Sequence, residues 1–424
     1  MVKKGYKQTE IGLIPGKWTV STIGAIADVK TGPFGSALHA EDYVQDGTPI
    51  ITVEHLGETG LTHQNLPKVS EKDRHRLFAY SMQEGDIVFS RVGSVDRNAY
   101  VTAIENGWLF SGRILRLRAK NEKLSTQYLG YYFKSEDTKE RIRNVAVGQT
   151  MPSLNTKLMN AFKVVLPTIE EQKDIAALLS NMDTLISALE KQISKKKAIK
   201  QGAMQELLTG KRRLPGFSGE WETKKLEDYC SLITKQTGFD YSAYIKPALI
   251  TRKMPNTFPM IQTINFRGRK FTFETDYYIP QSVAMQFPNI VLNKKCVLFS
   301  IVGASVGNVG LYPGSITAFC GGAIGITRFR NEQDAEWVYN YMSGPDGQSQ
   351  IQYVTKGGAQ ATVTIADIRN FKIPTPEKDE RDAISGILEN MDHEIEVLEQ
   401  KLEKYREVKQ GMMQQLLTGK IRLV

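Results

Sequence analysis

KQGAMQELLTGKRRL at residues 200–214 and KQGMMQQLLTGKIRL at residues 409–423 are identical at 12 of 15 positions. They close a longer duplication: residues 162–214 align with residues 371–423 without a gap, and the Asn-Met-Asp tripeptide at 181–183 recurs at 390–392. The similarity continues more weakly upstream, where GDIVFSRVGS (85–94) matches KCVLFSIVGA (295–304). The chain is therefore an internal repeat, and each copy is predicted to be a variable domain followed by a nearly invariant tail.

Both tails have the apolar spacing of a coiled coil, with intervals that alternate between four and three residues. The predicted coiled-coil seam consists of Ile175, Leu179, Met182, Ile186, Leu189, Ile193, Ile384, Leu388, Met391, Ile395, Leu398 and Leu402. Pro167 and Pro376 precede the two segments, and Gly210 and Gly419 follow them, as is typical of helix starts and stops. At roughly 1.5 Å per residue each helix would be about 60 Å long, so we expect it to act as a spacer.

The charges predict how the two helices pack. Residues 170–190 carry a net charge of −4 and residues 191–213 one of +7, and the second tail repeats this polarity with −7 over residues 377–399 and +4 over residues 400–424. Each helix thus runs from an acidic to a basic end, as its dipole favours. Parallel packing would place like charges together, whereas antiparallel packing pairs acid with base. The sequence predicts an antiparallel pair with pseudo-twofold symmetry.

Length and composition narrow the class of protein. A chain of 424 residues, of which 41% are hydrophobic and 24% charged, is typical of a folded protein with two or three domains. It has no run of 18 apolar residues, and no apolar segment follows the N-terminal lysines, so we expect a cytoplasmic protein without a membrane partner. Cys230, Cys296 and Cys320 are far apart in sequence and the histidines are scattered, which predicts neither a disulfide framework nor a metal site.

We divide the chain into a first domain (1–167), a first helix (168–213), a second domain (214–375) and a second helix (376–424). Strand-like alternation, as in RILRLR (113–118), and one helix in each domain, around 125–143 and 334–343, predict the α+β class. The aromatic face of that helix is expected to lie in the core. GASVGNVG at 303–310 lacks the spacing and lysine of a phosphate-binding loop and is interpreted as a turn-rich connection between strands.

The net charge of +9 belongs to the two domains, because the charges of the two helices cancel. Residues 1–169 carry +5 and residues 214–376 carry +4. Two basic domains at the ends of a neutral rod favour a long polyanion as partner, since neutralised phosphates release counterions. Charge alone is weak support, because many proteins that bind ribosomes or lipid surfaces are equally basic.

Polar and basic side chains gather in the predicted loops, and these are the side chains that contact phosphates and base edges. The alternative for any one loop is a solvated surface without a ligand. The candidate DNA-binding residues are Arg91, Ser94, Arg97, Asn98, Gln149, Thr150, Ser153, Asn155, Lys157, Arg252, Lys253, Asn265, Arg267, Arg269, Lys270, Gln360 and Thr362.

A variable basic domain followed by a heptad helix that ends in LLTGK, then the same plan again, resembles the specificity subunit of type I restriction-modification systems. The resemblance covers the whole chain. Its most specific parts are the two LLTGK helix ends, the two Asn-Met-Asp segments, and PGKW (15–18) matching GFSGEW (216–221) where each domain opens. It implies two target recognition domains, each reading one half of a split, asymmetric site in double-stranded DNA, and two helices that set the unread spacer.

The resemblance also implies partners: two modification subunits docked on the helices, which bind S-adenosylmethionine and methylate adenine, and separate restriction or motor subunits. The sequence itself has no cofactor-binding glycine loop, no Asn/Asp-Pro-Pro-aromatic motif, and no helicase or nuclease motif. We therefore expect a non-catalytic subunit without a cofactor or metal of its own, with any base flipping in the partner's pocket.

Three other functions remain open at this point. A coiled-coil adaptor whose basic domains bind proteins would show no salt-dependent, sequence-selective DNA binding. A methyltransferase subunit with its own chemistry would need the motifs that the sequence lacks. An RNA-binding protein would call for exposed aromatic platforms and ribonucleoprotein motifs, and the sequence has none of these motifs.

Overall fold

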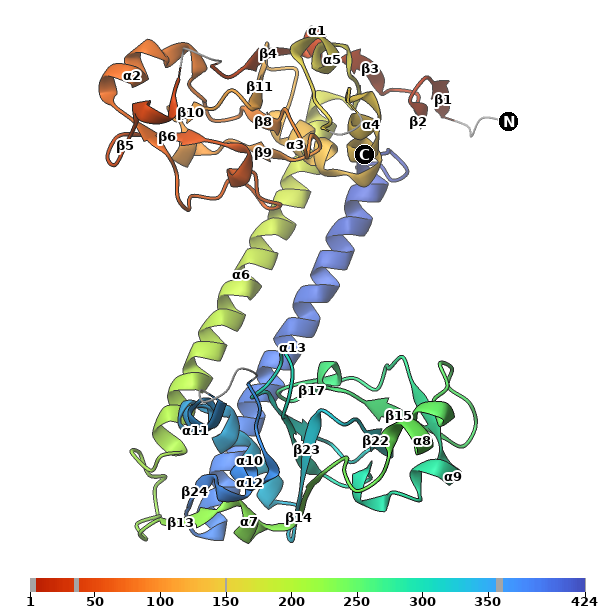
Figure 1. Ribbon diagram of the computed structural model, residues 1–424. Coiled ribbons are helices and arrows are strands. Elements are labelled where there is room, and N and C mark those ends of the chain that lie inside the picture. Colours follow the sequence, from red (N-terminus) through yellow and green to blue (C-terminus); the bar gives the residue numbers. More distant parts are fainter. Residues whose placement is uncertain (1–4, 34–37, 149–150, 356–360, 424) are drawn as a thin grey trace. The chain divides into compact units, whose positions relative to one another are not determined.

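The computed structural model describes residues 5–33, 38–148, 151–355 and 361–423. The chain forms two compact units, which we call unit 1 (residues 1–191 and 400–424) and unit 2 (residues 192–399). Each unit contains one α+β domain and one half of each of two long helices (Figure 1). No helix in the described part of the chain combines the length and apolar character needed to cross a membrane.

The two long helices that the sequence predicts are α6 (Ile169–Leu207) and α13 (Lys378–Leu416), of 39 residues each. Gly210 and Gly419 lie just beyond them with φ angles of +69° and +71°. This left-handed backbone favours glycine and is a common way for a helix to end. Of the predicted seam residues, Met182, Met391 and Leu398 are half-buried and all the others are buried.

Ion pairs between α6 and α13 show how the helices run within each unit. In unit 1, Asp183 pairs with Lys409 at 2.5 Å and Glu190 with Arg406 at 2.6 Å. In unit 2, ion pairs include Lys196–Glu394, Lys197–Glu399 and Lys200–Asp392. The second half of each helix lies against the first half of the other. The predicted antiparallel packing of acidic on basic halves is confirmed in both units.

The domain of unit 1 is built on a four-stranded antiparallel sheet. Its strands lie in the order β4 (Ala27–Thr31), β11 (Ile114–Ala119), β8 (Ile87–Ser90) and β9 (Asn98–Tyr100). A smaller sheet has the order β10 (Leu109–Phe110), β6 (Thr48–Ile51), β7 (Lys68–Val69) and β5 (Tyr43–Val44). Two strand pairs are β1 (Tyr6–Thr9) with β2 (Gly12–Pro15) and β3 (Thr19–Thr22) with β12 (Lys163–Leu166). The helices are α1 (Ile23–Ile26), α2 (Glu71–Arg76), α3 (Thr126–Lys134), α4 (Glu136–Val145) and α5 (Thr156–Ala161).

The domain of unit 2 repeats this plan. Its main sheet has the order β14 (Cys230–Lys235), β23 (Ile324–Phe329), β20 (Cys296–Ser300) and β21 (Val309–Tyr312). The smaller sheet has the order β18 (Tyr278–Pro280), β15 (Thr257–Ile261), β22 (Ala318–Cys320) and β19 (Val291–Leu292). The strand pairs are β13 (Glu222–Lys225) with β24 (Lys372–Thr375) and β16 (Phe266–Arg267) with β17 (Lys270–Phe271). The helices are α7 (Leu226–Tyr229), α8 (Tyr241–Tyr244), α9 (Gln281–Ala284), α10 (Asp334–Ser343), α11 (Pro345–Thr355) and α12 (Ile365–Asn370).

The helix predicted around 125–143 is in fact two helices. Ser135 has an extended backbone and separates α3 from α4, and its hydroxyl donates to the Tyr132 carbonyl. The aromatic face of α3 lies in the core as expected, where Tyr128 and Phe133 are fully buried. The three cysteines are buried and free, and burial raises the pKa of the Cys230 and Cys296 thiols to about 12.

Candidate nucleic-acid interface

Loops from distant parts of the sequence meet at one end of the main sheet of unit 1, which we call hairpin end 1. It comprises the β8–β9 loop (91–97), the turn before β11 (111–113) and residues 151–157. The Arg91 amide donates to the Arg113 carbonyl and the Leu154 amide to the Arg91 carbonyl, both at 2.8 Å. Because β8 and β11 are antiparallel neighbours, the last residue of β8 and the first residue of β11 lie side by side at the same end of the sheet.

The same arrangement recurs in unit 2 as hairpin end 2, made of residues 301–308, 321–323 and 361–364. The Ile301 amide donates to the Ala323 carbonyl at 2.9 Å, and the Val363 amide donates to the Ile301 carbonyl at 3.0 Å. The segment 301–308 connects β20 to β21, as its turn-rich sequence predicts. The backbone frame is therefore common to both units, while the side chains on it differ.

The third residue of each hairpin loop is a glycine for a conformational reason. Gly93 and Gly303 have φ angles of +80° and +90°, a region that L-residues with a side chain seldom adopt. The two glycines occupy matching places in the repeat, each three residues after its strand, β8 or β20, ends. The shared Val-Gly dipeptide is thus explained by the turn that it forms.

Several predicted residues of the first domain lie at hairpin end 1. Ser94 and Lys157 are exposed, and Asn155 caps α5 by accepting a hydrogen bond from the Leu158 amide at 2.8 Å. Arg91 is half-buried and donates to the Gly112 carbonyl at 3.4 Å. Ser153 forms backbone bridges with Val92 and Val147. Gln149 and Thr150 lie outside the described residues.

Two other predicted residues of this domain donate hydrogen bonds to backbone carbonyls of unit 1. Asn98 is only 5% exposed, and its amide donates to the carbonyls of Asp96 and Phe133. Arg97 is exposed, but its guanidinium donates to the Leu56 carbonyl and lines a cleft beside the long helices. Both side chains therefore have hydrogen-bond partners within unit 1.

In the second domain, Thr362 lies at hairpin end 2, and Arg252, Lys253 and Arg267 are exposed elsewhere on the surface. Asn265 is 2% exposed, and its amide donates to the Thr272 and Glu274 carbonyls. Its polar side chain therefore stabilises a tight loop by hydrogen bonds and does not face solvent. Gln360 lies outside the described residues.

Arg269 and Lys270 fasten their loop to α13. Arg269 pairs with Glu336 at 2.6 Å and with Asp392 at 2.8 Å, and Lys270 pairs with Glu399 at 2.5 Å. Burial alone would lower the pKa of the Arg269 guanidinium, but the hydrogen bond and charge of Glu336 and the charge of Asp392 raise it above its ordinary value. These two cations thus have acidic partners within unit 2.

The structure also reveals polar residues at the hairpin ends that the sequence did not single out. Arg113 is exposed at hairpin end 1. The alternation in RILRLR (113–118) predicts a strand from Arg113, whereas β11 begins one residue later, at Ile114. Buried polar atoms without a hydrogen-bond partner among residues 5–33, 38–148, 151–355 and 361–423 include Ser111 Oγ and Gln236 Nε2. Ser111 belongs to hairpin end 1, and Gln236 directly follows β14 at the same edge as hairpin end 2.

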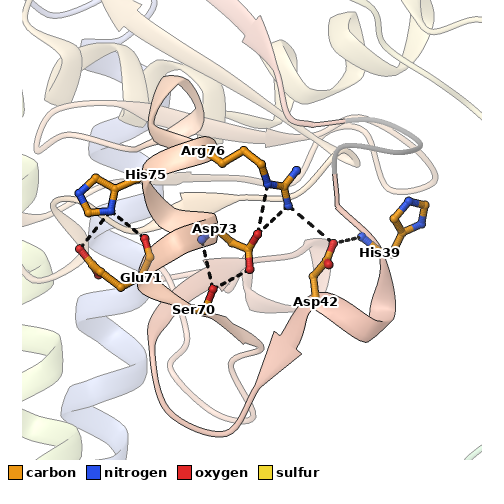
Figure 2. Close-up of polar contacts among 7 residues, drawn as sticks. All are labelled: His39, Asp42, Ser70, Glu71, Asp73, His75 and Arg76. Carbon is orange, nitrogen blue, oxygen red and sulfur yellow. Dashed lines mark hydrogen bonds and ion pairs between the residues drawn. The ribbon is translucent and has the colours of Figure 1, made fainter.

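Helix α2 carries a cluster of charged and polar side chains that Figure 2 shows in detail. Ser70 caps the helix, Arg76 pairs with Asp73 at 2.8 Å, and Arg74 pairs with Glu71 at 2.6 Å. The hydrogen bonds from Ser70 and Arg76 lower the pKa of the Asp73 carboxyl. Both arginines of α2 therefore have an acidic partner close by.

A second feature is repeated where the helix tails meet the domains. In unit 1 a cleft of about 1090 Å³ lies between the end of α13 and the start of α4, and in unit 2 a cleft of about 290 Å³ lies between the end of α6 and the start of α11. Four residue types recur at an offset of 209. They are Met413, Gln414, Thr418 and Asp137 in the first cleft, and Met204, Gln205, Thr209 and Asp346 in the second.

Comparisons with known proteins agree with this repeated architecture. Two relatives from Methanocaldococcus jannaschii are named as specificity subunits of the type I restriction enzymes MjaX and MjaVIII; they are 29% and 24% identical, over 99% of this chain and 97% of each relative. The crystal structure of the type I restriction-modification S subunit from M. genitalium has a similar fold. Its TM-score is 0.61 at 15% identity, over 94% of this chain and 96% of that one.

The family profile described as "Type I restriction modification DNA specificity domain" matches this chain twice, at residues 15–200 and 218–405. Each match takes in one variable domain and most of the helix that follows it. Together they cover most of the sequence and coincide with the internal repeat. The chain belongs to the type I restriction-modification DNA specificity family and carries two copies of its domain.

Proposed function

We propose that this chain is the DNA recognition subunit of a type I restriction-modification complex and that each variable domain reads one half of a split, asymmetric site. The observation that carries the proposal is the pair of hairpin ends, one backbone frame that displays different side chains in the two units. A shared frame with different side chains is what two unlike half-sites require, because base edges are distinguished by side-chain donors, acceptors and methyl contacts.

The polar character of the hairpin ends supports contact with DNA. Exposed Ser94, Arg113 and Lys157 surround hairpin end 1, and Ser111 Oγ is a buried polar atom that finds no partner among the described residues. Buried polar groups are usually satisfied, so such an atom beside exposed loop residues favours a polar ligand or water there. Phosphate and base-edge groups of DNA provide that chemistry.

The helices would set the unread spacer and hold the partners. Two modification subunits docking at the two repeated clefts would explain why methionine, glutamine, threonine and aspartate recur there while the hairpin ends diverge. In this assignment the chain is not itself an enzyme: methyl transfer with S-adenosylmethionine belongs to the modification subunits, and restriction to separate motor subunits. The contacts that select the DNA sequence are then all made by this chain.

The test is selection from a randomised duplex library at physiological salt, with this chain co-purified with its modification subunit. We expect enrichment of two unlike short motifs at one fixed separation, and a native mass of one chain with two modification subunits. A stable complex that enriches no motif would contradict DNA recognition and favour the adaptor function. Enrichment of a single continuous motif would contradict the split site.

A further inference from the structure

The two hairpin ends differ sharply in charge. Besides Arg97, whose guanidinium donates to the Leu56 carbonyl, hairpin end 1 carries Arg91, Arg113 and Lys157. Arg113 and Lys157 are exposed, and neither forms an ion pair within the described parts of the chain. Arg91 and Arg113 lie on adjacent backbone segments, joined by the hydrogen bond between their main chains. Three cations therefore surround one surface of unit 1.

The matching positions of unit 2 are all uncharged. Ile301 and Ala323, joined by the same backbone hydrogen bond, take the places of Arg91 and Arg113. Asn155 and Thr364 cap α5 and α12 in the same way, so Ala366, two residues after Thr364, takes the place of Lys157. Hairpin end 2 thus repeats the backbone of hairpin end 1 without these three cations.

Other cations of unit 2 lie outside these matching positions: Arg267 is exposed next to Gly268, which bridges to Gly310 of β21, and Lys235 is the last residue of β14. Of the α2 arginines of unit 1, Arg74 pairs with Glu71. Arg76 pairs with Asp73 and Asp42 (Figure 2). In unit 2, Arg252 and Lys253 precede β15, whose opposite end, at Ile261, accepts the backbone hydrogen bond from Gly321 at hairpin end 2. A five-residue strand spans about 17 Å. These cations therefore lie a strand's length from the matching surface.

We propose that hairpin end 1 is a phosphate clamp formed by Arg91, Arg113 and Lys157 and that hairpin end 2 has no equivalent, so that the two half-sites contribute unequally to the salt dependence of DNA binding. The inference rests on the proposed function. Log affinity falls linearly with log salt concentration. Each phosphate that a cation neutralises adds about 0.9 to the magnitude of this negative slope. Hairpin end 2 is uncharged and contacts its half-site through groups whose contribution to the binding free energy depends little on salt.

The experiment measures affinity for the selected duplex by fluorescence anisotropy across a series of salt concentrations, with the co-purified complex. R113A is expected to reduce the slope by about 0.9 and the double variant R113A/K157A by about 1.8. Lys123→Ala is the matched control, because Lys123 is equally exposed but lies beyond the opposite end of β11. A323R should add about 0.9 to the slope, since it creates in unit 2 the cation that unit 1 has.

Library selection on R113A separates a phosphate contact from base reading. A phosphate contact weakens binding to all sequences and leaves the selected motif unchanged, which is the expected result. Relaxed selection at one base pair would make Arg113 a base-reading residue and overturn the clamp. A salt slope that is unchanged in R113A/K157A, while selective binding persists, would also overturn the clamp. Loss of selective binding by the unaltered complex would instead refute the proposed function.

Discussion

At the residue scale, one cluster explains why the helix ends are so alike. In unit 1, Trp18 Nε1 donates to Glu171 at 2.9 Å, and Arg422 donates two hydrogen bonds to the same carboxylate. In unit 2, Trp221, Glu380 and Arg213 form the same cluster. The arginine follows LLTGK at the end of one helix, and the glutamate begins the other. In each unit, the arginine after the repeated motif thus forms an ion pair with a buried carboxylate at the start of the other long helix.

Replacing Arg422 by alanine is expected to destabilise unit 1 strongly. Glu171 is 3% exposed, so its carboxylate would lose its charged partner while staying buried, which typically costs about 3 kcal/mol of unfolding free energy. Urea unfolding measures the loss, and hydrogen exchange should localise it to unit 1. Arg212→Ala is the control and should cost less than about 0.5 kcal/mol, because Arg212 is exposed and its nearest carboxylate is 3.6 Å away. Equal losses in the two variants would refute the role of the cluster.

This cluster also shows what the sequence could not predict. The recurrence of LLTGK was visible, but its partners are remote in sequence and emerge only once the helices pack. For the same reason, the sequence did not predict that Asn98 and Asn265 are buried. Their amides donate to backbone carbonyls in the interior. Residue type predicts polarity, whereas exposure depends on contacts made by the folded chain. Arg113 was missed because a strand boundary shifted by one residue.

At the scale of elements, the long helices were the most predictable part of the fold. Their period, end signals and charge polarity are local properties, and together they predicted both the helices and their antiparallel packing. Sheet order was beyond prediction, because β4 pairs with β11 and β15 with β22 across long stretches of chain. The hairpin ends depend on that pairing, which is why only part of each was recognised.

The pairing of α13 with its neighbours predicts a pH effect. Hydrogen bonds from Lys197 and Lys270 lower the pKa of the Glu399 carboxyl below its ordinary value of 4.5. A lowered pKa contributes stability above the ordinary value, and this contribution is lost as the pH falls through the lowered one. E399Q should therefore reduce the unfolding free energy at pH 7, by less than about 1 kcal/mol for a partly exposed pair. The difference from the unaltered protein should shrink as the pH falls below 4.5 and vanish only below the lowered pKa.

Urea unfolding at pH 7 and at pH 4 tests this effect. Glu389→Gln serves as the control, because Glu389 is exposed on the same helix and forms no ion pair with residues in the described part of the chain. It should change the unfolding free energy less than E399Q at pH 7. A loss in E399Q that stays the same in acid would show that packing, and not charge, is responsible.

At the scale of the whole molecule, each long helix belongs to both units, and the unit boundary crosses α6 after Lys191 and α13 after Glu399. The ion pairs on either side of the boundary, Glu190–Arg406 and Lys197–Glu399, involve both helices. An insertion in α6 alone would therefore shift one helix against the other and break pairs in one unit. Matched insertions at the two boundary positions would preserve the contacts within both units.

We expect four residues inserted into both helices at these positions to lengthen the spacer of the recognised site and to leave both half-sites unchanged. Four helical residues add about 6 Å, which corresponds to about two base pairs of DNA. Library selection on the altered complex measures motifs and separation together. Four residues inserted after Lys123, in a loop of unit 1, form the control and should leave the separation unchanged. An altered half-site, or an unaltered separation in the helix variant, would contradict a spacer set by helix length.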